Sequence, residues 1–386
     1  MKRCMVIAGE ASGDLLAAEL VRALRRQLDK KTPKVNVAFF GAGGPMMQEA
    51  GVELAFDMTS HAVVGLVEVI RNYGKFRRLF QQLLELAVER KPEAIICVDF
   101  SGFNRRFAHA VRARACQEGG WRPKIIQYVS PQVWASRPGR AEKMARDFDL
   151  LLAIFPFEKA WYEKRTPGFR VEFVGHPMVE RHQRFSKEQT SLQPSALPLI
   201  AVLPGSRTGE LQRHLPVMRE AVEKIASEVS VRWRMVLPNE ALAKAGREQF
   251  GLMKGGEIRV GGLEETLKEA CIAIASTGTV TLECAWFGVP TVAIYKTSWG
   301  TYQVGKRIIQ VPFLAMPNLL AKKEVFPELI QNAASGERIA RAALGLLTNP
   351  DRRKAIGREL QSVADSLGEA GAPERAAGAI LKELDF

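Results

Sequence analysis

The chain has few residues that could form disulfides or hold a metal ion. Five of its 386 residues are cysteine and five are histidine. The cysteines lack CxxC spacing, and four of them lie in or beside apolar segments, so we expect buried thiols in a reducing compartment rather than disulfides. No two histidines have the spacing of zinc ligands. The sequence therefore predicts no metal and no cofactor.

Long hydrophobic runs and targeting segments are also missing. No apolar run approaches the roughly 20 residues of a membrane-spanning helix. The chain enters a predicted strand at Cys4–Ala8 directly, without the apolar segment of roughly 7–15 residues and the small-residue cleavage site of a signal peptide. There is no internal repeat or low-complexity tract. We therefore expect a soluble cytoplasmic protein.

The length and the charge of the chain narrow its organisation and its partners. A chain of 386 residues exceeds the usual size of one domain, so two domains are expected. The formal net charge of +13 and the pI near 9.6 indicate an anionic partner: nucleic acid, an anionic membrane face or a phosphorylated substrate. A nucleic-acid surface would need aromatics among clustered cations, but the basic residues here are dispersed.

The first half of the chain alternates short apolar runs with amphipathic segments. This alternation predicts a parallel sheet with helices on both faces. The predicted strands are Cys4–Ala8, Val35–Phe40, Ala94–Val98, Lys124–Val129, Leu150–Ile154 and Val171–Val174. The predicted helices are Leu15–Leu28, Phe76–Glu89, Arg105–Gln117, Arg140–Arg146 and Phe157–Lys164.

The alternation restarts after a polar, proline-containing break at Lys187–Pro198. The elements predicted there are strands Leu199–Leu203, Arg232–Leu237, Ile258–Val260, Cys271–Ala275 and Thr291–Ile294, with helices Leu215–Ser227 and Thr279–Phe287. We therefore predict an α/β protein with two Rossmann-like domains, residues 1–185 and 186–351. A helical tail, residues 352–386, would return to the first domain. Ligands of such folds bind beyond the carboxyl ends of the strands, here most simply in a cleft between the domains.

The segment around residues 276–283 is the strongest nucleotide-binding candidate. A buried strand breaks at small residues, and a helix follows directly, which suits a diphosphate. A carboxylate one turn later, Glu283, can accept hydrogen bonds from two vicinal ribose hydroxyls. An ordinary capped turn explains the same pattern. The predicted nucleotide-binding residues here are Ser276, Thr277, Gly278, Thr279 and Glu283.

A second loop of the same half follows the strand Leu199–Leu203. Gly205 allows the backbone to turn, Ser206 offers a hydroxyl and an N–H, and Arg207 can donate two hydrogen bonds to phosphate oxygens. We therefore add these three residues to the predicted nucleotide site.

Two loops and a histidine of the first half are candidates for substrate contact. Asp99 ends the strand Ala94–Val98, where a general base should stand, although it could equally cap the next helix. The first strand ends in a loop of small and acidic residues, and His176 follows the last strand. A tight turn or a structural histidine explains these patterns as well. The predicted substrate-loop residues are Gly9, Glu10, Ser12, Gly13, Asp14 and His176.

Residues 62–80 combine apolar and basic side chains. Residues 76–90 have the spacing of a helix that packs on a sheet. The preceding stretch is too apolar for a simple loop, so we expect an acceptor or membrane surface there. The residues assigned to it are Val64, Leu66, Val67, Val69, Ile70, Arg71, Lys75, Arg77 and Arg78.

Together these motifs closely resemble the lipid A disaccharide synthase family, over nearly the whole chain and in the family's order. Single motifs have low specificity, but the set is specific, above all QYVSPQVWASR and PNLLA. The shared segments are GEASGD (9–14), FFGAGGPMMQ (39–48), VVGLVEV (63–69), QYVSPQVWASR (127–137), FPFEKAWYEK (155–164), FVGHPM (173–178), LPGSR (203–207), STGTVTLEC (276–284) and PNLLA (317–321).

The resemblance implies an inverting GT-B glycosyltransferase that needs no metal. Its substrates would be UDP-2,3-diacylglucosamine and 2,3-diacylglucosamine 1-phosphate, and it would work at the cytoplasmic face of the inner membrane. The family's essential Asp, Arg and Asn map onto Asp99, Arg207 and Asn318. One position departs from the family pattern: Gly102 stands where an IDAPDFN-like motif often has a second Asp.

A different GT-B enzyme is the alternative interpretation. A UDP-N-acetylglucosamine transferase of peptidoglycan synthesis or a UDP-sugar 2-epimerase would share the nucleotide loops. Neither is expected to carry QYVSPQVWASR or PNLLA.

Overall fold

The computed structural model describes residues 2–30, 35–59, 73–117, 119–186, 197–251 and 253–385. The chain divides into two compact units. The first consists of residues 1–188 and 367–386, and the second of residues 189–366. No helix among the described residues is long and apolar enough to cross a membrane.

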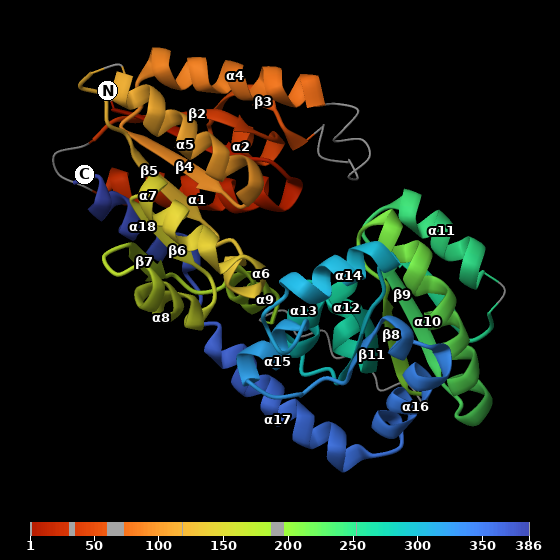
Figure 1. Ribbon diagram of the computed structural model, residues 1–386. Helices are drawn as coiled ribbons and strands as arrows, with labels where there is room; N and C mark the ends of the chain where they lie inside the picture. The colour runs from red at the N-terminus through yellow and green to blue at the C-terminus, as the bar shows by residue number, and fades with distance from the viewer. Residues whose placement is uncertain are drawn as a thin grey trace. The chain divides into compact units, whose positions relative to one another are not determined.

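The first unit is built on a seven-stranded parallel sheet in the order β3-β2-β1-β4-β5-β6-β7 (Figure 1). The order reverses between β1 and β4, which creates a switch point there. The strands are β1 (Lys2–Ala8), β2 (Val37–Gly43), β3 (Glu53–Asp57), β4 (Ala94–Val98), β5 (Lys124–Tyr128), β6 (Leu150–Ala153) and β7 (Arg170–Phe173).

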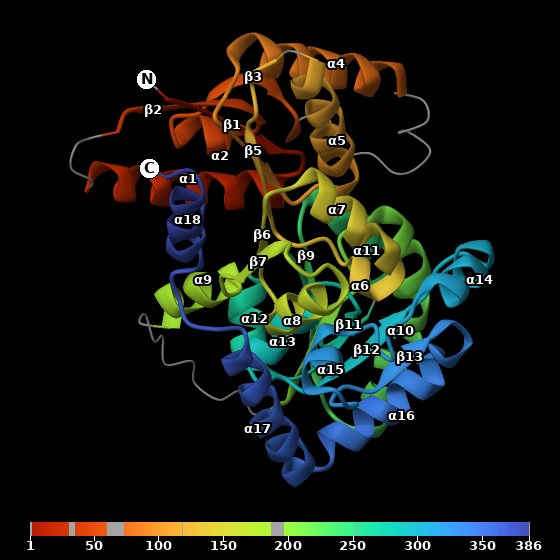
Figure 2. The ribbon, with the colours of Figure 1, turned by 60° about the vertical axis from the view of Figure 1, so that its left-hand side comes forward.

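Helices cover both faces of this sheet (Figure 2). On one face, Leu83, Phe107 and Val111 from α4 and α5 pack with Ile7 and Ile95 of the strands. The periodicity of residues 76–90 therefore predicted this packing correctly. The helices of the unit are α1 (Ala11–Asp29), α2 (Pro45–Glu49), α4 (Tyr73–Arg90), α5 (Ser101–Gln117), α6 (Val133–Ser136), α7 (Ala141–Asp147), α8 (Pro156–Arg165), α9 (Pro177–Ser186) and α18 (Ala372–Glu383), with a 3₁₀ turn, η2, at Pro138–Arg140.

The second unit has a six-stranded parallel sheet in the order β10-β9-β8-β11-β12-β13. Its switch point lies between β8 and β11. The strands are β8 (Leu199–Leu203), β9 (Arg232–Leu237), β10 (Gly256–Val260), β11 (Ala270–Ser276), β12 (Thr291–Tyr295) and β13 (Glu328–Ile330). The helices are α10 (Thr208–Glu228), α11 (Glu240–Phe250), α12 (Leu263–Glu269), α13 (Val280–Trp286), α14 (Trp299–Ile308), α15 (Met316–Ala321), α16 (Gly336–Leu347) and α17 (Pro350–Ser366), with a 3₁₀ turn, η3, at Gln331–Ala333.

The predicted class, two Rossmann-like α/β domains, is confirmed, and two edge strands were missed. The central strands β4, β8 and β9 occupy the predicted residues. The sequence analysis did not predict β3 or β13. Each lies at the edge of its sheet, and neither has a buried residue. An edge strand that is not buried on both faces has no continuous apolar run to reveal it.

The C-terminal residues divide between the units. Helix α17 belongs to the second unit, while α18 packs along α1 of the first. The side chain of Gln27 donates a hydrogen bond to the carbonyl of Glu374 at 2.7 Å, and Arg375 donates to the carbonyl of Val174 at 2.8 Å. These contacts attach α18 to both the first helix and the last strand of the unit.

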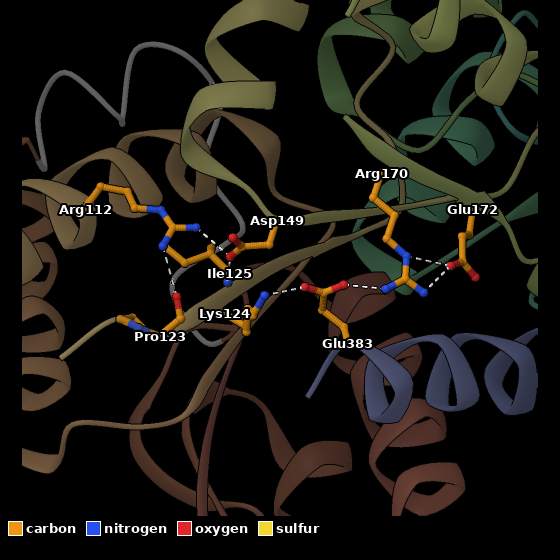
Figure 3. A network of polar contacts seen from close by, with 8 residues as sticks. All are labelled: Arg112, Pro123, Lys124, Ile125, Asp149, Arg170, Glu172 and Glu383. Atoms are coloured by element: carbon orange, nitrogen blue, oxygen red, sulfur yellow. Dashed lines mark hydrogen bonds and ion pairs between the residues drawn. The ribbon is translucent and has the colours of Figure 1, made fainter. Parts of the chain in front are cut away.

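The last turn of α18 ends in a charged network (Figure 3). Glu383 accepts from Lys124 at 2.7 Å and from Arg170 at 2.5 Å, so one carboxylate joins β5 and β7 to the C-terminal helix. Asp149 plays a similar part beside it, because it accepts from Arg112 at 2.5 Å and from the N–H of Ile125 at 2.7 Å. The side chain of Glu383 is 10% exposed, so its ion pairs are shielded from water on one side.

We expect Glu383→Ala to lower the free energy of unfolding by about 1–2 kcal/mol, because two cations lose a largely buried carboxylate. The loss should shrink in concentrated salt, which screens charge. Urea denaturation at low and high salt measures both effects. The matched control is Glu337→Ala, whose ion pair with Arg341 on α16 is exposed on both sides, at 65% and 74%. Equal losses in the two variants would contradict the structural role of Glu383.

Candidate active site

Four of the loops that carry predicted site residues lie at the switch points of the two sheets. In the first unit, the loops after β1 and β4 carry residues 9–14 and Asp99. In the second, the loops after β8 and β11 carry residues 205–207 and 276–279. Strand order reverses at both places, and open α/β sheets bind ligands there. Each unit therefore brings its own set of predicted residues together.

Asp99 lies on a turn with an uncommon backbone conformation. The φ angles of Asp99 and Phe100 are +50° and +36°, in the left-handed region that few non-glycine residues adopt. Hydrogen bonds from two side-chain amides stabilise this conformation. The amide of Asn104 donates to the carbonyl of Asp99 at 2.7 Å, and the amide of Gln127 donates to the same carbonyl at 3.0 Å.

Gln127 joins the ends of two neighbouring strands. It lies in β5 and is 1% exposed. Its amide also lies 3.2 Å from the carbonyl of Val129, another left-handed residue, at φ +70°. One buried side chain thus supports the turns that follow both β4 and β5. The sequence analysis did not single out Gln127, although it lies at the start of the QYVSPQVWASR segment.

The glycines of the first loop allow the Asp99 turn to pack closely. A Cβ atom at Gly9 would lie 2.3 Å from the ring of Phe100, so glycine is required there. At Gly13 the nearest contact would be 3.6 Å, to the Cβ of Asp99, which is ordinary contact. The role of Gly9 is therefore to leave room for the ring of Phe100.

The pKa of the Asp99 carboxyl is raised above its ordinary value. Burial disfavours the charged form, and the negative charge of Glu10 adds to this effect. A hydrogen bond from the backbone of Phe100 opposes the rise. A carboxylate with a raised pKa accepts a proton more readily than an ordinary aspartate, as a general base must.

Asp14 is a structural residue of this loop. Its side chain is 2% exposed and accepts from the backbone N–H groups of Gly44 at 2.8 Å, Met46 at 2.9 Å and Met47 at 3.1 Å. These are the free N–H groups at the start of α2, a neighbouring helix. The sequence analysis assigned Asp14 to the substrate loop, and in the structure its carboxylate caps α2.

The remaining predicted residues of the first unit differ in exposure. Glu10 and Ser12 are exposed. The ring Nδ1 of His176 accepts from the backbone N–H of Met178 at 3.2 Å, and the backbone N–H of His176 donates to the carbonyl of Leu367 at 2.9 Å. Burial, and next the charge of Arg181, lower the pKa of His176 to about 4, so the imidazole is neutral near pH 7.

In the second unit, Arg207 extends into solvent at the start of α10. Its side chain is 78% exposed, and its nearest carboxylate is Glu210, at 3.9 Å. Glu210 also accepts from the N–H of Ser206 at 3.3 Å. Gly205 has a φ of +118°, a backbone conformation that residues with a side chain rarely adopt, so this position favours glycine. The loop therefore combines a cation and a backbone donor beside an exposed surface.

The second loop of this unit connects β11 to α13. Thr281 bonds back to the carbonyl of Gly278 through its hydroxyl, at 2.8 Å, which fixes the turn before the helix. Glu283 lies in the first turn of α13 and is partly exposed. The strand, turn and helix that the sequence predicted here are present.

His214 fixes the position of the loop that follows β8. It is 1% exposed, lies 2.7 Å from the carbonyl of Pro204 through Nδ1, and accepts from the N–H of Lys296 through Nε2 at 3.0 Å. Because Nε2 accepts, Nδ1 carries the proton, and burial lowers the pKa of the ring. The sequence analysis missed this residue, whose partners lie far away along the chain.

Asn318 uses both ends of its amide within the second unit. It is fully buried. The Oδ1 atom accepts from the N–H groups of Val325 and Phe326, each at 2.8 Å. The Nδ2 group donates to the carbonyl of Phe326 at 2.8 Å and to Glu328 at 2.9 Å. The side chain thus ties α15 to the segment that leads into β13.

Most of the predicted acceptor or membrane surface cannot be placed. Val64, Leu66, Val67, Val69, Ile70 and Arg71 lie outside the described residues, as does the side chain of Lys75. Arg77 and Arg78 lie in α4 and are exposed.

Comparison with known proteins gives a consistent result. The family model described as Lipid-A-disaccharide synthetase matches residues 4–379. The Lipid-A-disaccharide synthase of Geobacter sulfurreducens is 37% identical over 390 residues, covering 99% of this chain and 97% of that protein. That of Geobacter metallireducens is 38% identical with the same coverage.

The fold is similar to that of a solved glycosyltransferase. The crystal structure of the glycotransferase of kitacinnamycin matches with a TM-score of 0.63 and 18% identity, covering 99% of each chain. At that identity the likeness concerns the fold alone. With the two parallel-sheet units, it identifies the fold as GT-B, as the sequence predicted.

We expect Asp14→Ala to lower the free energy of unfolding by roughly 2–4 kcal/mol, because three N–H groups at the start of α2 lose a buried acceptor. Asp14→Asn keeps one acceptor oxygen and should lose less. Thermal and urea denaturation measure the difference. The control is Ser12→Ala, at an exposed position of the same loop. A stable Asp14→Ala protein would show that capping α2 is not the role of Asp14.

Proposed function

This chain belongs to the lipid-A-disaccharide synthetase family, and from that premise we propose that it joins two acylated glucosamines. The donor is UDP-2,3-diacylglucosamine, and the acceptor is 2,3-diacylglucosamine 1-phosphate. The products are the β-1,6-linked tetraacyl disaccharide 1-phosphate and UDP. The observation that carries the proposal is the strained, partly buried Asp99 turn at the switch point of the first unit.

The chemistry is a single in-line displacement. The α-linked donor gives a β-linked product, so the anomeric carbon inverts. The 6-hydroxyl oxygen of the acceptor forms the new bond to that carbon, while the bond from the carbon to the UDP oxygen breaks. UDP leaves with the bonding electron pair, and the hydroxyl proton passes to a base.

Asp99 is the base in this proposal. Its carboxylate lies at the carboxyl end of a buried strand, its pKa is raised, and its backbone is fixed by Asn104 and Gln127. A base held in one place avoids the cost of ordering it during reaction. Asn104 and Gln127 are positioning residues, because they act through Asp99.

The donor belongs to the second unit in this proposal. Arg207 and the backbone at Ser276–Thr279 stabilise the charge that develops on the departing UDP. Glu283 binds the ribose hydroxyls, and Gly205 and Ser206 approach the diphosphate. The exposed guanidinium of Arg207 supports this assignment, since a substrate can reach it. Asn318 is a positioning residue, because its buried amide makes four hydrogen bonds within the unit.

The substrates imply where the enzyme works. Both carry acyl chains and phosphate groups, so we place the protein at the anionic cytoplasmic face of the inner membrane, bound peripherally. The net charge of +13 supports this assignment.

We expect Asp99→Asn to abolish sugar transfer while UDP affinity stays nearly unchanged, because an amide occupies the same space but cannot take the hydroxyl proton. The assay measures UDP release with UDP-2,3-diacylglucosamine and the acceptor, and calorimetry measures UDP binding. Release that depends on a diacylated sugar phosphate also excludes another UDP-sugar enzyme of this fold. Near-normal turnover would move the base elsewhere.

Gly102, where the family pattern often has a second Asp, allows a sharper test of whether the base must stand at position 99. Gly102 is the second residue of α5, and a Cβ there would meet nothing within 4 Å, so an aspartate fits. If Asp99 is the base, adding Gly102→Asp to Asp99→Asn restores nothing. Restored turnover would show that a carboxylate at position 102 can replace it.

We expect Gln127→Met to lower kcat by about 10²-fold, because the base is no longer held in place. A turn that is no longer held in place would let the carboxylate of Asp99 leave the surroundings that raise its pKa, so the pKa should fall and the acid limb of the pH–rate profile should move to lower pH. The KM for the donor should not change. The control is Thr166→Val, which removes a buried hydrogen bond of the same unit, 3.0 Å to the carbonyl of Tyr162. A Gln127→Met profile that keeps the wild-type pH dependence would reduce Gln127 to a purely structural role.

A further inference from the structure

Four arginines of the first unit, which we call the arginine cluster, lie close to one another beside the Asp99 turn. Arg105 and Arg106 lie early in α5, the helix that begins two residues after Asp99. Arg137 and Arg140 lie on the segment that follows β5, the strand next to β4. Partial burial lowers the pKa of Arg140, and the positive charges of the other three arginines lower it further. Four cations therefore act on one another within a small region.

The packing of two helices brings these arginines together. Helices α5 and α7 lie side by side (Figure 2), and each follows a strand of the same sheet. Farther along them, the ring of His109 in α5 lies 3.2 Å from the carboxylate of Asp147 in α7. Arg140 directly precedes α7, so it lies near the start of α5, where Arg105 and Arg106 are.

The charge of the arginine cluster is not neutralised within the described part of the chain. Among the described residues, none of the four guanidinium groups forms an ion pair with a carboxylate. Arg112, farther along α5, is paired with Asp149 at 2.5 Å. Two of the four, Arg106 and Arg137, are exposed, and the other two are partly exposed. Unpaired arginines that gather at one accessible place are typical of a site for an anion.

A buried carboxylate holds the segment that carries Arg137. Glu158 of α8 is fully buried and accepts from the indole N–H of Trp134 in α6 at 2.9 Å. It also accepts from the backbone N–H of Phe155 at 3.1 Å. The backbone N–H of Arg137 donates to the carbonyl of Val133 at 2.9 Å. The backbone of this segment is thus fixed before a ligand arrives, which lowers the cost of binding.

The acceptor of the proposed reaction carries its phosphate close to the reacting hydroxyl. The phosphate is attached to C1 of the sugar, and the reacting hydroxyl is attached to C6, which is bonded to C5. Because C1 and C5 both flank the ring oxygen, the two groups lie at the same edge of the sugar. An acceptor whose 6-hydroxyl meets Asp99 must therefore place its phosphate near Asp99 as well.

We propose that the arginine cluster binds the 1-phosphate of the acceptor. A phosphate monoester carries about two negative charges near pH 7, and guanidinium groups donate paired hydrogen bonds to its oxygens. Arg105 follows Asn104, whose amide donates to the carbonyl of Asp99 at 2.7 Å, so one helix supports both the base and the phosphate site. Side chains of a helix lean toward its N-terminus, which here is the Asp99 turn. The inference rests on the proposed function, because it assigns one group of that acceptor.

Kinetics with two acceptors test the assignment. One is 2,3-diacylglucosamine 1-phosphate with acyl chains short enough for solubility in water, and the other is the same sugar without phosphate. We expect Arg106→Gln with Arg137→Gln to lower kcat/KM for the phosphorylated acceptor by about 10²-fold, mainly through the KM for the acceptor, because charged hydrogen bonds are lost in the ground and transition states alike. The loss on the acceptor without phosphate should be much smaller, and the KM for the donor should not change.

The matched control removes the same charge elsewhere in the same unit. Arg114→Gln with Arg122→Gln replaces two exposed arginines, the first of them in the last turn of α5, and should affect neither acceptor. Arg106→Lys with Arg137→Lys keeps the charge without the paired hydrogen bonds, so it should recover only part of the loss. Removing two of four like charges relieves repulsion, so the thermal midpoint of the glutamine variant should not fall.

Calorimetry measures the site without turnover. The probes are glucosamine 1-phosphate and glucosamine. We expect the wild type to bind glucosamine 1-phosphate more tightly than glucosamine, and the glutamine variant of Arg106 and Arg137 to lose this preference. A phosphate preference that depends on these arginines in a protein that transfers sugar to neither acceptor would overturn the proposed function alone.

Other outcomes would overturn the assignment. Equal losses of turnover on the two acceptors would make the arginine cluster a support of the Asp99 turn. A raised KM for the donor would make the diphosphate of UDP its ligand. Equal effects of the cluster and control variants would show that net charge alone attracts the acceptor. A loss seen only when anionic vesicles are added would make the phosphates of membrane lipids the ligand.

Discussion

Burial of the parallel strands on both faces is the constraint on which the rest of the structure depends. The residues of β4 and β8 are all buried, so no polar side chain can work along their length. Polar groups must gather where strands end, and in a parallel sheet the carboxyl ends share one edge. Both sheets reverse their order between the first and fourth strands of the unit, β1 and β4 in one and β8 and β11 in the other. Open α/β sheets bind ligands at such points.

Within these loops, the hydrogen-bond partners of a polar side chain distinguish residues that stabilise the fold from residues that are free to act on a substrate. Asp14 and Asn318 are buried, and each accepts from several backbone N–H groups. Their removal would leave buried donors unpaired, so we expect these replacements to lower stability even though neither residue need contact the substrate. Asp99 and Arg207 differ. The backbone of Asp99 is held by two buried amides, while its carboxyl group has a raised pKa, and the guanidinium of Arg207 is largely exposed. The structure positions Asp99 and Arg207 and leaves their charged groups available to a ligand.

The sequence predicted the parts of the molecule that local patterns determine. Strands buried on both faces are continuous apolar runs, so β4 and β8 were placed at the correct residues, and the positions of the loops after them could be predicted as well. Contacts between distant segments could not be predicted. Gln127 binds the carbonyl of a residue 28 positions away, and His214 binds an N–H 82 positions away. The edge strands β3 and β13 and the exposed helix α14 lack the periodic burial that makes an element visible in a sequence.

Apolar side chains can be distinguished in a similar way, by whether the protein buries them or leaves them in water. An apolar residue whose unit buries it belongs to the scaffold, as Leu83 and Phe107 do in the first unit. Trp299 and Val304 remain in water although the second unit has a large core beside them. Exposure of that kind costs free energy in the isolated chain, and a partner that covers the residues recovers it.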